Sequence, residues 1–156
     1  MPDGSGTHRA SSSANFSVSI DGVAVGTFTE VAGLAAEVSV EEIAEGGSGF
    51  VHKMPSKVTW PNLVLKRGLV QGNELLLWFE EFTENVIAGK AYSRSTITIN
   101  AHRPDSSIIR EWNFMGGIPV KWTGPNFQAG SNQVQVEELE IAHHGFAAQS
   151  AASSSG

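Results

Sequence analysis

The sequence contains no cysteine, and this absence excludes several kinds of site at once. Without a thiol there is no disulfide framework, no thiolate metal centre and no cysteine nucleophile. Long apolar runs are also missing: the longest covers residues 75–79, whereas about 18–20 residues are needed to cross a bilayer. We therefore expect no transmembrane segment. Residues 1–13 are small and polar and lack the apolar stretch of a signal peptide.

Basic residues are few. Ten Lys and Arg stand against sixteen Asp and Glu, which gives a formal net charge of −6 at pH 7. The basic residues are scattered, apart from Lys66-Arg67, whereas binding of a phosphate backbone needs a concentrated cationic surface. We therefore expect no specific nucleic-acid recognition, and the composition is compatible with assembly in the cytoplasm.

The chain has 156 residues, enough for one domain with a sizeable core. We expect three parts: a disordered N-terminal tail at residues 1–14, a folded domain at residues 15–146 and a disordered C-terminal tail at residues 147–156. Both ends consist mainly of small and polar residues, which cannot offset the conformational entropy that folding costs.

Alternation of apolar and polar residues predicts a mainly β fold. The clearest alternation lies at residues 16–20 and 94–102. Further strands are expected at residues 23–31, 36–44, 60–69, 108–115, 120–123 and 133–144.

Two of the expected strands change phase at a pair of glutamates. Val38 and Val40 alternate, but Ile43 follows Glu41-Glu42 out of phase, and Leu139 follows Glu137-Glu138 in the same way. One extra residue at each glutamate pair would restore the alternation, so we predict a β-bulge at each.

One helix is expected at residues 74–87, with Asn73 as its N-cap and Gly89 just after its end. Apolar residues recur on one side at helical spacing, namely Leu75, Trp78, Phe79, Phe82 and Val86. The other side carries Glu74, Glu80, Glu81 and Glu84. Leu77 projects among these glutamates, either as an ordinary exposed leucine or as part of a docking surface.

No catalytic or metal-binding pattern is recognisable. His143 and His144 are adjacent on an expected strand, so their side chains point to opposite faces and cannot act as a pair of ligands. Paired glutamates can serve glycoside hydrolysis only when they are held at a defined separation. Here the pairs fall at expected bulges or on an exposed helix face. We therefore expect no enzyme, no cofactor and no metal site.

The four tryptophans leave a second function open. Trp78 lies on the apolar side of the expected helix, where core packing is its natural role. Trp60, Trp112 or Trp122 would suit a surface on which sugars stack. A carbohydrate-binding β-sandwich is therefore the alternative.

Residues 45–56 combine a glycine-rich start with apolar side chains that lack an evident partner. The glycines favour a mobile connector over core structure. Phe50, Val51 and Met54 need an apolar contact, either within the domain or on a neighbouring chain.

A series of short motifs resembles the tail-tube proteins of contractile phages and of related injection systems. In chain order the motifs are Phe28-Thr29-Glu30-Val31-Ala32-Gly33-Leu34, Glu45-Gly46-Gly47, Leu63-Val64-Leu65-Lys66-Arg67-Gly68, Ile109-Arg110-Glu111-Trp112-Asn113-Phe114, Pro119-Val120-Lys121-Trp122 and Val136-Glu137-Glu138-Leu139-Glu140-Ile141-Ala142-His143-His144-Gly145. Each motif is weak alone, but their common order spans essentially residues 15–146. Gly116-Gly117 departs from the family, which often has Asn-Ala there.

The resemblance implies two packed antiparallel sheets, sandwich-like or barrel-like, with one flanking helix. Six copies would form a ring, and strands of all six, including residues 60–69, would close an inner β-barrel. Stacked rings would form the hollow inner tube of a phage tail or phage-tail-like particle. The implied partners are further copies of the chain, a contractile sheath protein, baseplate, spike and terminator proteins, and cargo in the lumen.

The resemblance also implies two contact regions. A loop would reach a neighbouring subunit or the next ring; its residues are Glu45, Gly46, Gly47, Phe50, Val51, His52, Lys53 and Met54. The helix would face the cationic inner surface of the sheath through Glu74, Leu77, Glu80, Glu81 and Glu84.

Overall fold

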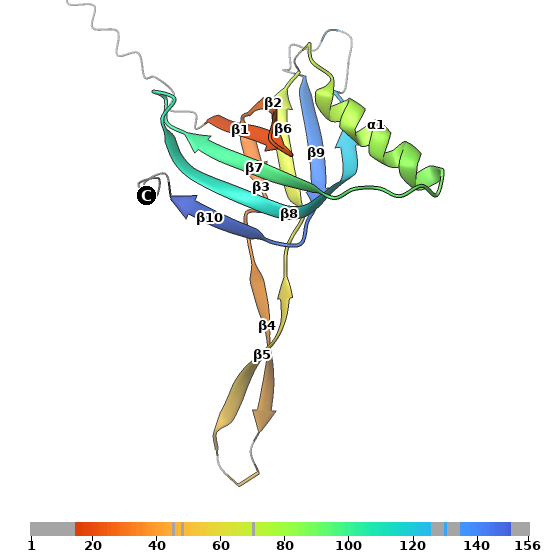
Figure 1. The fold of residues 1–156 in the computed structure, drawn as a ribbon. Helices are drawn as coiled ribbons and strands as arrows, with labels where there is room; N and C mark the ends of the chain where they lie inside the picture. The colour runs from red at the N-terminus through yellow and green to blue at the C-terminus, as the bar shows by residue number, and fades with distance from the viewer. Residues whose placement is uncertain are drawn as a thin grey trace, which may run out of the picture.

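The computed structural model describes residues 15–44, 46–47, 49–69, 71–125, 130 and 135–150. For residues 148–150 it describes the backbone alone. These residues form a β-rich body with a helix at one end and a long two-stranded arm that projects from the body (Figure 1).

One antiparallel sheet curls around the core of the body. Its strand order is β2-β1-β7-β8-β9-β6-β3, and β10 pairs with β8 outside this path. The strands are β1 (Asn15–Ile20), β2 (Val23–Phe28), β3 (Glu30–Ala32), β6 (Leu63–Gly68), β7 (Ser95–His102), β8 (Ile108–Thr123), β9 (Val136–Ala142) and β10 (Phe146–Ser150). Strand β8 serves both halves, because its first part pairs with β7 and β10 and its last part with β9. The predicted mainly β, antiparallel fold is thus confirmed. The two expected layers are the two halves of one curled sheet.

The core lies between these two halves. Strands β1, β7 and the first part of β8 contribute Val18, Ile97, Ile99 and Phe114, all fully buried. Strands β6 and β9 contribute Leu63, Leu65, Leu139 and Ile141, also fully buried. Strict alternation places these residues inward because successive side chains of a strand point to opposite faces.

The expected strand at residues 23–31 is in fact two strands. Thr29 separates β2 from β3, and its backbone N–H donates to the carbonyl of Lys66, 3.0 Å away. The chain crosses here from one edge of the curled sheet to the other, so β3 pairs with β6 rather than with β1. The body is therefore barrel-like within a single copy.

The helix α1 (Glu74–Ile87) has the predicted bounds. Leu75 is fully buried in the core, and Trp78 and Phe79 pack against it. Gly89 follows with φ = +66°, which ends the helix, but the Asn73 side chain makes no capping hydrogen bond. In the described part of the chain no helix is long and apolar enough to span a membrane.

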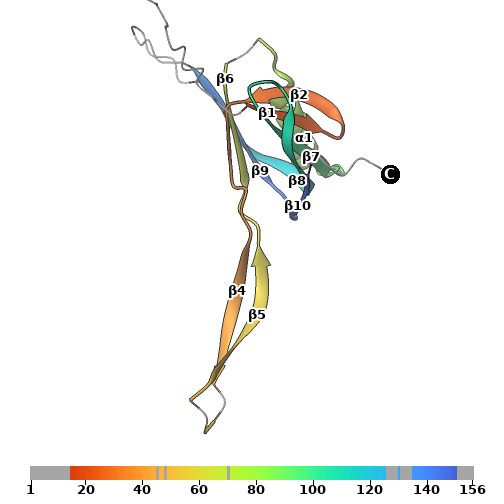
Figure 2. The same cartoon turned by 90° about the vertical axis from the view of Figure 1, so that its left-hand side faces the viewer.

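The arm is the largest departure from expectation. It consists of β4 (Glu37–Ala44) and β5 (Val51–Thr59), which pair along their whole length (Figure 2). The prediction of a mobile connector at residues 45–56 is therefore wrong for residues 51–56. Both faces of β5 are exposed and its sequence contains Pro55, so no alternation of apolar and polar residues indicates a strand there. Proline is tolerated in a strand whose outer edge is unpaired.

Three other expectations need correction. Residues 108–115 and 120–123 belong to one strand, β8, which runs through Gly116 at φ = +64°. The C-terminal tail begins later than residue 147, because β10 continues to Ser150 and pairs with β8. The fourth strand begins at Leu63 rather than at residue 60, and residues 133–134 of the last expected strand lie outside the described residues.

The two predicted bulges are not at the glutamate pairs. In the arm, the register shifts between Ser39 and Val40, where Ser56 is the extra residue of β5. In the pairing of β8 with β9, the register shifts on β8, between Pro119 and Lys121. Strand β9 itself is regular, and the phase change arises because Glu137 points into the core.

Candidate functional site

Strands β4 and β5 of the arm pair with each other and with no other strand of the described residues. All residues of β4 and β5 are exposed, although the arm carries an apolar stripe. Val38 lies opposite Val58, and Val40 opposite Pro55, so these four side chains share one face. The three valines are each about half exposed, at 51–52%. An isolated two-stranded hairpin is marginally stable in water, so this face is suited to contact another surface.

The predicted loop residues lie at the far end of the arm. Gly46 and Gly47 belong to the turn, Phe50 precedes β5, and Val51, His52, Lys53 and Met54 lie within β5. Phe50 is 65% exposed, and its ring meets that of His52 edge-on with centroids 5.3 Å apart. Glu45 lies outside the described residues.

An aromatic cluster fixes the base of the arm to the body. The Trp60 ring meets Phe146 edge-on with centroids 5.2 Å apart, and the His143 ring meets Phe114 at 4.9 Å. Nε2 of His143 lies 3.0 Å from the Pro61 carbonyl, and the Gly145 N–H donates to Nδ1. Both contacts suit a neutral ring that carries its proton on Nε2, and burial lowers the pKa of His143.

The tryptophans do not form an open platform for sugars. Trp60 is covered on one side by Phe146 and His143, and Trp112 and Trp122 pack against the buried core. Among the described residues there is also no group of three or more side chains suited to hold a metal ion.

Helix α1 presents its glutamates to solvent, as expected. Glu74, Leu77, Glu80, Glu81 and Glu84 are all exposed, and Leu77 is 52% exposed among them. Their surroundings differ, however, because Glu81 also lines a pocket between α1 and the start of β7. On the other flank of the helix an apolar groove lies between Phe79, Val86, Ile87 and Val120.

An ion pair inside the body was not foreseen. Arg67 and Glu137 face each other across β6 and β9, and both are almost fully buried. A signal for it exists in the sequence: Arg67 is in phase with Leu63 and Leu65, and Glu137 with Leu139.

Comparison with known families identifies the kind of protein that carries these surfaces. Residues 12–147 match the model of the T4-like virus tail tube protein gp19 family. The chain belongs to this family. It is a structural subunit of a contractile-tail tube, and not an enzyme.

Solved structures similar to this tail tube protein include chains of an extracellular contractile injection system and of the anti-feeding prophage. A chain of the PVC sheath/tube terminator in the extended state is 28% identical, with a TM-score of 0.71, and the match covers 86% of this chain and 93% of that one. A chain of the PVC sheath-tube complex in the extended state is 25% identical, with a TM-score of 0.70 and coverage of 86% and 88%. A chain of the tube-terminating cap of the anti-feeding prophage is 26% identical, with a TM-score of 0.73 and coverage of 87% and 88%. No curated protein sequence is significantly similar to the chain.

Proposed function

We propose that the chain forms six-membered rings, that these rings stack into a hollow tube, and that a contractile sheath drives this tube through a target envelope. The arm is the observation that carries the proposal. It projects away from the body with an apolar face and two unpaired strand edges, which a second copy of the chain would cover (Figure 1).

Free strand edges on the body support closure into a ring. Strand β3 pairs on one side only, with β6, and residues 118–123 of β8 pair only with β9 among the described residues. These edges lie on opposite sides of the half-sheet β3-β6-β9-β8. Pairing of the β3 edge of one copy with the β8 edge of the next would continue the sheet around a barrel and remove both edges.

The outer surface of this half-sheet would then line the lumen. It carries charges of both signs, with Glu30 opposite Lys66, Lys66 opposite Glu138, and Glu140 opposite Lys121. Such a hydrophilic wall suits the passage of cargo because it offers no extended apolar surface to which the cargo would adhere.

The proposed external partners follow from the relatives. The similar chains come from a sheath-tube complex, a sheath/tube terminator, a tube cap and a baseplate. We infer that the tube meets a sheath protein through the exposed side of α1 and meets terminator and baseplate proteins at its two ends. Assembly takes place in the cytoplasm of the producing cell.

Shortening the arm tests this function. Replacement of residues 41–54 by Asn-Gly joins Val40 to Pro55, which already face each other, so the shortened hairpin keeps its register. Electron microscopy is expected to show six-fold rings and stacked tubes for the wild-type chain and folded but unstacked protein for the shortened variant. Normal tubes from the shortened variant would contradict the role of the arm, and a wild-type chain that stays monomeric with its baseplate partners would contradict the tube.

A matched variant tests the apolar face alone. Val40→Thr with Val58→Thr keeps β-branched side chains of similar shape but adds hydroxyl groups. Because both valines are half exposed in the single copy, its stability is expected to change by less than about 1 kcal/mol. Stacking is expected to weaken.

A further inference from the structure

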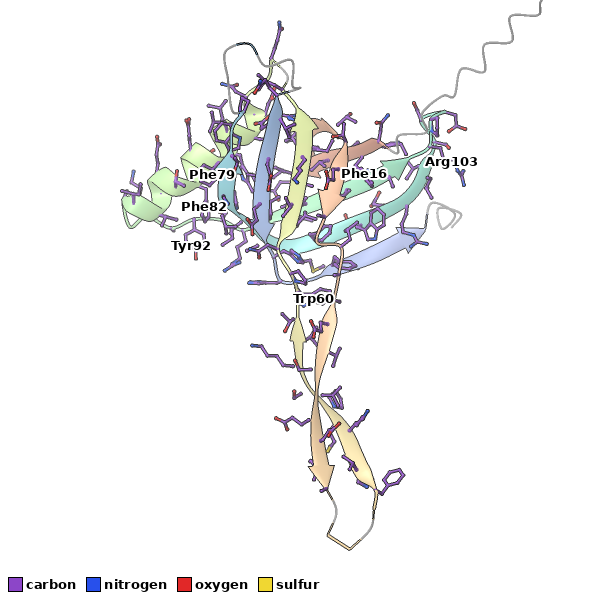
Figure 3. All side chains as sticks on the ribbon, turned by 180° about the vertical axis from the view of Figure 1, so that it is seen from behind. Phe16, Trp60, Phe79, Phe82, Tyr92 and Arg103 are labelled. Carbon is purple, nitrogen blue, oxygen red and sulfur yellow. The ribbon has the colours of Figure 1, made fainter. Side chains whose placement is uncertain are left out.

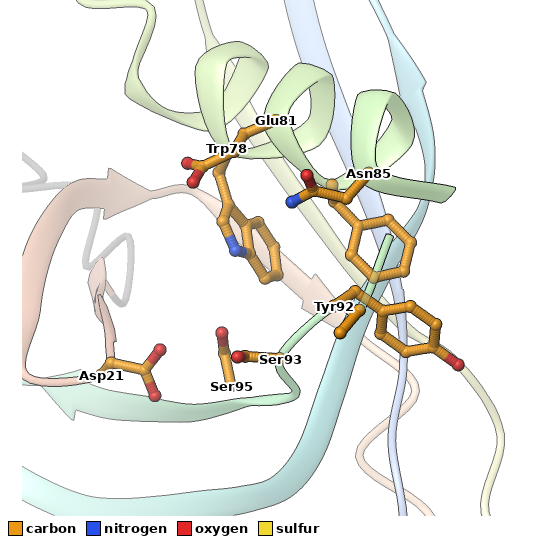
Figure 4. A pocket seen from close by; sticks show the side chains of 9 residues that line it. Asp21, Trp78, Glu81, Asn85, Tyr92, Ser93 and Ser95 are labelled. Atoms are coloured by element: carbon orange, nitrogen blue, oxygen red, sulfur yellow. The ribbon is translucent and has the colours of Figure 1, made fainter. Parts of the chain in front are cut away.

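A pocket of about 260 Å³ lies between α1, the β1–β2 turn and the segment that leads into β7. Its walls include three aromatic side chains, Trp78, Phe82 and Tyr92. Asp21 and Glu81 face each other across it (Figure 4). Among the described residues no lysine or arginine lines the pocket, so neither carboxylate has a counter-charge within this lining.

The floor of the pocket carries a hydroxyl group. Ser95 is only 5% exposed and lines the pocket. In Figure 4 this side chain lies on the pocket side of β7, below Trp78. A hydroxyl oxygen can accept a hydrogen bond from a donor that enters the pocket.

This combination of groups fits a guanidinium ion. Aromatic faces attract a cation through their quadrupole, and arginine also stacks on them. Two carboxylates and a hydroxyl offer several acceptors to its planar set of N–H donors.

The chain itself presents such a group at the turn between β7 and β8. Arg103 is exposed, and its charge interacts with that of Asp105 in the same turn. The turn that holds it is well ordered: the Arg103 N–H donates to the Ser107 carbonyl, and Asp105 accepts hydrogen bonds from both the N–H and the hydroxyl of Ser107. Little conformational freedom of the backbone remains to be lost on binding.

Pocket and arginine lie at opposite ends of the body. Figure 3 shows Arg103 at one end and the pocket residues Phe82 and Tyr92 at the other. A copy therefore cannot fill its own pocket, whereas a head-to-tail neighbour can. Contacts of this kind join unlike surfaces and close into rings.

We propose that Arg103 of each subunit occupies the pocket beneath α1 of the adjacent subunit in the ring. This inference rests on the ring proposed above and supplies a specific contact between neighbours. The same face of the helix then serves two partners, with Glu81 turned to the next subunit and Glu80 and Glu84 left free.

Cross-linking tests the contact directly, because the chain has no cysteine of its own. The double variant Arg103→Cys with Glu81→Cys, treated with a short bismaleimide, is expected to give a covalent ladder that ends at the ring size. In the control, Glu74→Cys replaces Glu81→Cys about two turns away, at the start of α1, where it is exposed and outside the pocket. It is expected to give little product. Equal ladders from both variants, or no ladder from the first, would overturn the contact.

Charge exchange gives an independent readout. Arg103→Glu and Glu81→Arg are each expected to raise the protein concentration needed for half-assembly of rings at least about tenfold, and the double variant to restore assembly. Arg110→Glu makes the same charge change on β8 beside the same turn, opposite Ala101, and is expected to have little effect. If both single variants form normal rings and Glu81→Arg loses sheath assembly, the pocket binds the sheath protein and not the next subunit. This result would overturn the proposal. Absence of rings from the wild-type chain would overturn both this contact and the ring.

Discussion

Arg67 and Glu137 form an ion pair inside the body, with Nε of Arg67 3.0 Å from Oε2 of Glu137. Their side chains are 3% and 4% exposed. A second nitrogen of Arg67 donates to the Val25 carbonyl, and the guanidinium lies 5.1 Å from the centroid of the Phe28 ring. The indole N–H of Trp122 donates to the other oxygen of Glu137, 2.9 Å away. The pair thus ties β6 and β9 to β2 and β8, and so joins both halves of the sheet.

Removal of one partner of this pair is expected to be severe. Arg67→Met leaves the Glu137 carboxylate buried without its counter-charge, which typically costs about 3–5 kcal/mol. The double variant Arg67→Met with Glu137→Leu removes both charges and is expected to lose less. Urea unfolding followed by tryptophan fluorescence gives the free energy of unfolding.

The neighbouring exposed pair provides the control. Lys66 and Glu138 also face each other across β6 and β9, with 3.9 Å between Nζ and Oε2, and both side chains are about a third exposed. Lys66→Met is expected to cost less than about 1 kcal/mol. Equal losses from Arg67→Met and Lys66→Met would show that burial of the inner pair has no special effect.

A glycine sets the close approach of two chain segments at the base of the arm. Gly33 has φ = +89°, and a Cβ placed on it would overlap the carbonyl oxygen of Asn62. Gly33→Ala is therefore expected to lower the free energy of unfolding by at least about 1–3 kcal/mol, the usual cost of such backbone strain. Thermal unfolding of the single copy measures this loss.

Gly46→Ala, in the turn of the arm, is the matched substitution. None of the described residues lies within 4 Å of the added methyl group, and Gly46 does not have a positive φ. The change in stability is expected to stay within about 0.5 kcal/mol. A neutral Gly33→Ala would mean that the two segments are not held at the distance described.

Elements that bury one face were predictable from the sequence. The helix has its predicted bounds because an amphipathic pattern is followed by Gly89 in the left-handed conformation. Strands β1 and β7 were also predicted, since each turns one face to the core.

Elements defined by pairing or by buried charge were not predictable in the same way. Strand β5 has no buried face, so only its partner β4 defines it. Glu137 was placed with Glu138 at a bulge because the apolar residues change phase there, and only Arg67 explains its buried position. The phase of Arg67 and Glu137 with buried leucines marks each as inward-facing, but a local pattern does not identify a partner that is distant in sequence.

Acid is expected to weaken the aromatic cluster at the base of the arm. Burial holds the pKa of His143 below its ordinary value of 6.5. As the pH falls below about 6.5, the unfolded chain takes up this proton before the folded chain does, so folding loses stability until the pH passes the lower folded pKa. Above this range both states are neutral at His143, and its full contribution to stability is present.

The difference between two variants isolates this effect from the other histidines. The melting temperature of His143→Gln is expected to be lower than that of the wild type at pH 8 but to fall less steeply between about pH 6.5 and 5. His144→Gln keeps the buried ring and removes only the smallest of the causes that lower the pKa of His143, so most of the wild-type slope is expected to remain. A wild-type slope in His143→Gln would show that another group causes the acid sensitivity.

The exposed side of α1 is expected to control attachment of the sheath. Glu80→Lys with Glu84→Lys reverses two charges on the side of the helix that faces away from the body. Complementary charge steers protein partners together, whereas like charges repel, so sheath assembly on the tube is expected to fail. The helix itself is expected to tolerate the change, because its last turn carries no basic residue and lysine there interacts favourably with the helix dipole. Electron microscopy of tubes that are co-expressed with sheath protein would show bare tubes of normal length.

A graded series separates charge from shape. Glu80→Gln with Glu84→Gln removes the charges at nearly constant volume, so its effect is expected to lie between the wild type and the lysine variant and to weaken as salt is added. Equal loss from the glutamine and lysine variants would indicate a specific hydrogen-bonded contact rather than a field of charge. Leu77→Ala completes the series: unchanged sheath assembly would make Leu77 an ordinary exposed leucine, and reduced assembly would place it in the docking surface. If Glu81 is the glutamate that faces the next subunit, rings are expected to remain intact in the lysine, glutamine and Leu77→Ala variants, because none of them changes Glu81.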